Sequence, residues 1–110
     1  MPENSVTRQG SSATVCLGGD LVASAVVETR GEWKQLLADG VTSLVVDLSL
    51  VQMVDSQGIG LFVAVYNSLQ KAGGSVAIVN ASKDIADLFT SMRLDHHFSI
   101  SGPQTERGGR

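Results

Sequence analysis

Residues 54–60 read VDSQGIG, and they stand where a strand-and-loop segment gives way to a long amphipathic helix. Apolar side chains recur at helical spacing after this stretch, at Ile59, Phe62, Val63, Tyr66 and Leu69. A glycine pair then ends the pattern. The sequence therefore predicts a helix over residues 56–72, with Asp55 or Ser56 as its amino-terminal cap.

Strand-like and helix-like segments alternate on both sides of this helix. Short apolar or alternating runs predict strands at residues 13–17, 43–48, 75–79 and 97–100, with the strand at 43–48 buried on both faces. Two more helices are predicted, over residues 24–38 and after a cap at Ser82. Their apolar stripes comprise Val22, Val26, Trp33 and Leu37 in the first, and Ile85, Leu88, Phe89 and Met92 in the second. This order predicts an α/β fold with right-handed crossovers.

The two ends of the chain carry no such pattern. Residues 1–10 and 101–110 are polar and aperiodic, so we expect flexible ends around one domain at residues 11–100. Cys16 is the single cysteine, which excludes an internal disulfide framework. No signal peptide is visible and no apolar run is long enough to cross a bilayer, so we expect a cytoplasmic protein without membrane insertion.

The charge balance argues against direct binding of nucleic acid. The net charge is −3, from 8 basic and 11 acidic residues, and no Lys or Arg stands between Gln35 and Gln70. A phosphate backbone requires a basic footprint, which this composition does not provide.

Two enzymatic interpretations of residues 54–60 are weak. A nucleophile elbow would need glycine where Val54 stands and a base near Ser56, whereas the histidines are His96 and His97. A phosphate-binding glycine loop would need glycine where Val63 stands, and its lysine is absent. The sequence therefore predicts no enzyme, no cofactor and no metal site.

Besides the enzymatic interpretations and a role as helix cap, a further interpretation makes Ser56 a phosphorylation site. The start of a helix offers free N–H groups and a positive dipole that tolerate a phosphate. The modification would add about −1.5 to −2 charges beside Asp55.

Several segments together resemble the STAS domain family, in particular its stand-alone bacterial anti-sigma-factor antagonists. They are VVDL at residues 45–48, MVDSQGIG at 53–60, AGGSVAIV at 72–79, and the glycine-acid-apolar turn Gly19-Asp20-Leu21. The resemblance covers about residues 11–100. It implies a four-stranded, mostly parallel mixed sheet with three main helices.

The resemblance also implies a switch. A serine kinase of the anti-sigma-factor type would phosphorylate Ser56, a serine phosphatase would reverse this, and the unmodified protein, a monomer or weak dimer, would bind the anti-sigma factor. We expect the partner-binding residues to be Asp20, Asp55, Ser56, Gln57, Gly58, Gly60, Leu61 and Val65. Spacing leaves open whether Gly58, Leu61 and Val65 widen the buried face of the helix or form a partly exposed docking patch.

Three positions depart from the family pattern, namely Val22, Gln57 and Arg93. The alternative function is that of a STAS regulatory subunit in a chemotaxis-like, two-component or lipid-transport complex. Asp47 is interpreted either as a structural hydrogen-bond acceptor or as a group that tunes the Ser56 site.

Overall fold

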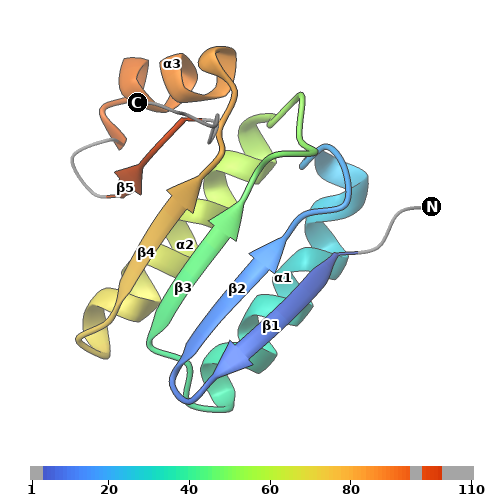
Figure 1. The fold of residues 1–110 in the computed structure, drawn as a ribbon. Coiled ribbons are helices and arrows are strands. Elements are labelled where there is room, and N and C mark those ends of the chain that lie inside the picture. The colour runs from blue at the N-terminus through green and yellow to red at the C-terminus, as the bar shows by residue number, and fades with distance from the viewer. Residues whose placement is uncertain (1–3, 95–97, 103–110) are drawn as a thin grey trace, which may run out of the picture.

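The computed structural model describes residues 4–94 and 98–102, which form a mixed five-stranded sheet with three helices (Figure 1). The elements are β1 (Ser5–Gln9), β2 (Ser12–Cys16), α1 (Ala23–Ala38), β3 (Ser43–Asp47), α2 (Ser56–Lys71), β4 (Ser75–Val79), α3 (Lys83–Ser91) and β5 (Ser99–Ile100). The strand order in space follows the chain. β1 is antiparallel to β2, and the other neighbours are parallel. The predicted α/β fold is confirmed.

β1 corrects the prediction that residues 1–10 are flexible. Residues 5–9 pair with β2 through a two-residue turn that starts at Gly10, whose φ of 60° suits glycine at the first position of a tight hairpin. All five residues of β1 are exposed, so the strand has no apolar alternation that would reveal it. At the other end, Ser101 N–H donates to the carbonyl oxygen of Ile78, and residues 103–110 lie outside the described part.

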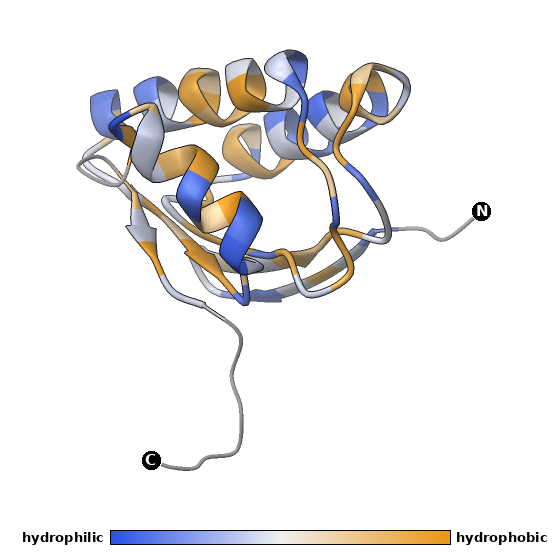
Figure 2. Ribbon diagram, turned by 90° about the horizontal axis from the view of Figure 1, so that it is seen from above, coloured by the Kyte–Doolittle hydropathy of each residue, from blue (hydrophilic) through white to orange (hydrophobic). Residues whose placement is uncertain are grey.

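The helices α1 and α2 cover one face of the sheet, and no described helix covers the other (Figures 1 and 2). Leu44 and Val46 of β3 are buried against the helices. Val45 and Asp47, which alternate with them, are only half-buried. The prediction that residues 43–48 are buried on both faces is therefore wrong, because the second face has no covering layer among the described residues.

The predicted helix boundaries agree with the structure to within one residue for α1 and α2. α3 begins at Lys83 after the predicted cap Ser82, whose Oγ accepts a hydrogen bond from Ile85 N–H at 3.3 Å. The prediction that Met92 belongs to the apolar stripe of α3 is wrong, because Met92 follows the helix end and is 48% exposed. Of the strand predicted at 97–100, Ser99 and Ile100 form β5, Phe98 precedes the strand, and His97 lies outside the described residues.

Phe62 of α2 is the centre of the core and is fully buried. Its ring lies 5.4 Å from that of Trp33, 5.3 Å from Phe89 and 6.1 Å from Phe98, measured between centroids. These contacts join all three helices and the segment before β5 into one core. Within the described residues, every helix is too short or too polar to cross a membrane.

Candidate functional site

Two strand-to-helix connections meet at the carboxyl ends of β2 and β3. Leu21 N–H donates to the carbonyl oxygen of Met53 at 2.9 Å, and Asp55 N–H donates to that of Leu21 at 3.2 Å. Leu21 and Val54 form an isolated parallel bridge. The parallel pairing of β2 with β3 thus resumes just before α1 and α2 begin, which holds the two helix starts side by side.

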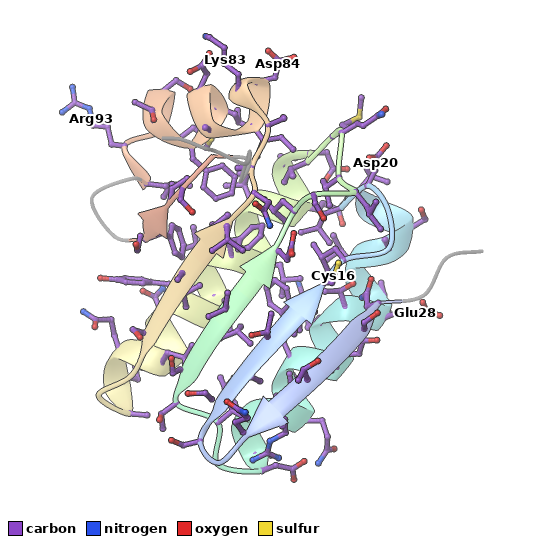
Figure 3. The ribbon with its side chains drawn as sticks, in the orientation of Figure 1. Cys16, Asp20, Glu28, Lys83, Asp84 and Arg93 are labelled. Atoms are coloured by element: carbon purple, nitrogen blue, oxygen red, sulfur yellow. The ribbon has the colours of Figure 1, made fainter. Side chains whose placement is uncertain are left out.

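Asp20 fixes the connection between β3 and α2. Its Oδ1 accepts hydrogen bonds from the backbone N–H groups of Gln52 at 2.7 Å and Met53 at 3.1 Å. Figure 3 places Asp20 beside this loop, across from the end of β3. The acidic residue of the glycine-acid-apolar turn therefore has a structural use, and its predicted contact with a partner stays a prediction.

Asp55 caps α2 and also reaches α1. Its Oδ1 accepts from the N–H groups of Gln57 and Gly58, both at 3.0 Å, and its Oδ2 accepts from Ala23 N–H at 3.0 Å. The hydrogen bond from Gly58 is the largest cause that holds the pKa of Asp55 below its usual value; desolvation opposes it, and the hydrogen bonds from Ala23 and Gln57 add to the lowering. The carboxylate is therefore ionised at neutral pH, and the predicted capping role falls to Asp55.

Ser56 is the first residue of α2, and its side chain is exposed. It faces solvent at the meeting point of the two connections. The expectation that a phosphate on Ser56 would rest on free N–H groups needs correction, because Asp55 already occupies those of Gln57 and Gly58. A phosphate here would stand next to an ionised carboxylate.

The two glycines of the signature differ in their surroundings. Gly58 is buried, and a Cβ on it would lie 2.5 Å from the carbonyl oxygen of Leu21 and 2.8 Å from Cγ1 of Val54. Gly60 is exposed, and a Cβ on it would meet nothing within 4 Å. Gly58 therefore permits close approach of the two connections, whereas Gly60 and the exposed Gln57 lie on the open surface of α2.

The docking patch predicted on α2 is wrong at all three of its positions, since Gly58, Leu61 and Val65 are buried. Leu61 is 3% exposed and Val65 is 5% exposed, so neither is available to a partner in the folded protein. The alternative, a wider buried face of α2, is confirmed. This helix packs against both the sheet and the neighbouring helices, which widens its apolar side beyond one stripe.

Two apolar side chains are exposed in the loop that leads from β3 to Ser56. Leu50 is 59% exposed and Met53 is 58% exposed, while the residue that follows each of them, Val51 and Val54, is buried. The sequence does indicate this exposure, because Leu50 and Met53 are large apolar residues in a predicted loop and belong to no periodic apolar stripe. The backbone of this loop is fixed by the hydrogen bonds that Asp20 Oδ1 accepts from the N–H groups of Gln52 and Met53, and spacing in the sequence does not reveal them.

Asp47 has a structural role. Its Oδ1 accepts from Ser49 N–H at 2.9 Å, which supports the first turn after β3. Cys16 is a free, half-buried strand residue. The described residues contain no cluster of three or more His, Cys, Asp or Glu side chains suited to a metal, and the pair His96-His97 lies outside them.

Comparison with known proteins agrees with this geometry. The family model described as "Mlab, STAS domain" matches residues 4–101. A search of curated proteins gives no match. The match begins before β1 and ends after β5, so it is wider than the predicted domain at residues 11–100.

Several solved structures share the fold. TM1081 of Thermotoga maritima, described as a candidate anti-sigma factor antagonist, is 18% identical with a TM-score of 0.84 over 89% of this chain and 85% of that chain. An anti-sigma factor antagonist from Mycobacterium paratuberculosis is 22% identical with a TM-score of 0.78, over 89% of this chain and 83% of that one. The Bacillus cell fate determinant SpoIIAA, in its phosphorylated form, is 19% identical with a TM-score of 0.73, over 88% of this chain and 89% of that chain.

At these identities the solved structures establish a common fold, while the family model establishes descent. Since that model spans the described structure from Asn4 to Ser101, the chain belongs to the STAS domain family.

Proposed function

We propose that this protein is an anti-sigma factor antagonist that works by binding and is not an enzyme. In this proposal the unmodified protein binds an anti-sigma factor with serine kinase activity, phosphorylation of Ser56 releases that partner, and a serine phosphatase restores binding. The observation that supports it best is the exposed hydroxyl-bearing residue at the first position of α2, in a fold shared with SpoIIAA, which has been solved in phosphorylated and unphosphorylated forms.

The surroundings of Ser56 supply a physical reason for release. Asp55 is ionised and already accepts the hydrogen bonds from the first turn of α2. The sequence has no Lys or Arg between residues 35 and 70 to neutralise a further charge locally. A phosphate on Ser56 would thus add about −1.5 to −2 charges to a surface that already carries Asp20 and Asp55. Docking would then have to desolvate that charge, which opposes binding.

The loop before Ser56 supplies the apolar part of the proposed binding surface. Leu50 and Met53 are more than half exposed, and Asp20 holds the backbone beside Met53 in place. A small, preordered apolar contact next to a charge-sensitive residue suits a partner that must be released by one modification.

Phosphate transfer is the first test. Purified protein is incubated with an anti-sigma factor kinase and ATP, and its mass is measured. We expect the wild type to gain one phosphate and Ser56→Ala to gain none. Ser24→Ala is the matched control, because Ser24 is an exposed serine in the first turn of α1 and should not affect phosphate transfer. A phosphate gained by Ser56→Ala as readily as by wild type contradicts the assignment.

Partner affinity is the second test. We expect Leu50→Asp and Met53→Asp each to weaken binding to the anti-sigma factor by about tenfold or more. Met92→Asp is the control, since Met92 is also exposed but follows α3. Ser56→Asp should bind weakly, and Ser56→Ala should bind without regulation. If the wild type neither binds nor accepts phosphate, the alternative of a subunit in a chemotaxis-like or lipid-transport complex is favoured.

A further inference from the structure

β1 lies at the edge of the sheet and is fixed to α1 at both of its ends. Before the strand, Asn4 Nδ2 donates to Thr29 Oγ1 at 3.2 Å and to Glu32 Oε1 at 2.9 Å. Near its end, the Arg8 guanidinium donates to the carbonyl oxygen of Gly10 at 3.0 Å and lies 4.0 Å from Asp39. These contacts hold β1 in place, although no described strand pairs with its outer side.

The hairpin determines which backbone groups face that outer side. Gln9 and Ser12 flank the two-residue turn and pair with each other, as do Thr7 and Thr14 two positions along. Pairs flanking such a turn are hydrogen-bonded, and hydrogen-bonded and non-hydrogen-bonded pairs alternate along an antiparallel ladder. The N–H and C=O groups of Val6 and Arg8 therefore point outward, away from β2.

The edge has only part of the usual protection against pairing. Sheet edges are commonly guarded by short strands, charged side chains, prolines or bulges, and β1 pairs with β2 without a proline or a bulge. The one charged residue of β1 is Arg8, and its guanidinium is turned toward Asp39 of its own chain. Val6 is 43% exposed on the same side of the sheet as Arg8, because both residues pair with buried residues of β2.

We propose that the outer edge of β1 pairs with β1 of a second copy of this chain, antiparallel and about a two-fold axis through Thr7. In this register Val6 faces the partner's Arg8, and every outward N–H and C=O group of the two strands is used. The aliphatic part of each Arg8 covers the exposed Val6 of the other copy. Other alignments are less favourable, since one brings the two Arg8 side chains opposite each other.

A second copy is the occupant that this edge suits best, because the antiparallel register through Thr7 uses the outward backbone groups of Val6 and Arg8 in both strands and keeps the two Arg8 side chains from facing each other. The result would be one continuous sheet across the dimer. A pairing of two five-residue strands is small, so we expect a weak, concentration-dependent dimer. The contacts that build the Ser56 site involve none of residues 5–9, so the inference is independent of the proposed function.

A positive charge introduced at the two-fold axis tests the proposal. Thr7 and Thr14 are exposed neighbours on the same face, but only Thr7 would face its own copy across the axis. Sedimentation equilibrium is measured up to about 1 mM, a range that suits small interfaces. We expect wild type to dimerise, Thr7→Lys to weaken the dimer at least about tenfold, and Thr14→Lys to dimerise within about twofold of wild type. Circular dichroism verifies that both variants are folded.

A cross-link tests the register directly. Facing residues of a non-hydrogen-bonded antiparallel pair have Cα atoms about 4.5 Å apart, within the range that a disulfide spans. In a Cys16→Ser background, Thr7→Cys should form a covalent dimer under mild oxidation, and Thr14→Cys should not. The proposal is overturned if the wild type is monomeric throughout, if Thr7→Lys dimerises like the wild type, or if Thr7→Cys fails to cross-link.

Discussion

The carboxylate of Asp55 accepts a hydrogen bond from the backbone N–H of Ala23 at 3.0 Å, so one side chain joins the starts of α2 and α1. Its other oxygen caps α2 through Gln57 and Gly58. A residue that sequence reasoning treats as a local cap is therefore also a tertiary contact. The position of the exposed Ser56 therefore depends on the contact of Asp55 with both helices and not on α2 alone.

Removing this carboxylate should loosen both helix starts. We expect Asp55→Ala to lower the melting temperature by about 5 °C or more, because the cap of α2 and the contact with Ala23 are lost together. Glu28→Ala is the control, since Glu28 is an exposed carboxylate on α1 and its removal should change the melting temperature little. Equal melting of Asp55→Ala and Glu28→Ala would show that the cap contributes nothing.

The same carboxylate should make stability depend on acid pH. The pKa of Asp55 is lower in the folded protein than its ordinary value of 3.8, so its ionised form stabilises the fold. This contribution is complete above the unfolded pKa and is lost as pH falls through the folded pKa, hence below about pH 4. The difference in melting temperature between wild type and Asp55→Asn, measured from pH 3 to pH 7, should therefore become smaller toward pH 3. A constant difference between them across the range would contradict this assignment.

Gly58 and Gly60 form a matched pair for a test of close packing. A methyl group at Gly58 would press on the backbone oxygen of Leu21, so Gly58→Ala should destabilise the protein by roughly 1–3 kcal/mol. Gly60→Ala meets open space within a helix and should stabilise it by roughly 0.5–1 kcal/mol. Urea unfolding measures both, and a Gly58→Ala protein as stable as Gly60→Ala would show that the two connections can separate without loss.

Asp20 should keep the loop between β3 and α2 ordered. The amides of Gln52 and Met53 are protected by its Oδ1, so Asp20→Ala should speed their hydrogen exchange by about tenfold or more. Asp84→Ala is the control, because Asp84 is an exposed acidic residue of α3. If the exchange of these two amides is unchanged in Asp20→Ala, the loop is ordered by other contacts.

The elements that bury an apolar side could be predicted from sequence. The periodicity around Phe62 and Trp33 gave α1 and α2 almost to the residue, because each packs a wide stripe against the sheet. β1 could not be found this way, since all its residues are exposed and its order comes from the contacts of Asn4 and Arg8 with α1. The open second face of the sheet was also missed, because Val45 is as apolar as a fully buried residue.

The sequence predicts where the site lies, but not which of its side chains are exposed. The Asp55-Ser56 pair at the start of α2 followed from the cap pattern. Helical spacing could not decide whether Leu61 and Val65 face solvent, since that depends on how broadly α2 is covered by its neighbours. How the loop holds Leu50 and Met53 exposed could not be predicted, because the loop is fixed by hydrogen bonds that Asp20 accepts. These bonds join residues 32 and 33 positions apart, which leaves no periodic pattern in the sequence.

Phe62 provides the strongest test of the core. Its ring is fully buried and contacts the rings of Trp33, Phe89 and Phe98, so Phe62→Ala should destabilise the protein by roughly 3–5 kcal/mol through lost burial and a residual cavity. That is a large share of the roughly 5–15 kcal/mol that stabilises a domain, so Phe62→Leu is needed as a milder variant that stays folded. Met92→Ala, at an exposed apolar residue, should leave unfolding in urea nearly unchanged. The loss should follow the order Phe62→Ala, then Phe62→Leu, then Met92→Ala, and a Phe62→Ala protein that unfolds at the wild-type urea midpoint would place the core elsewhere.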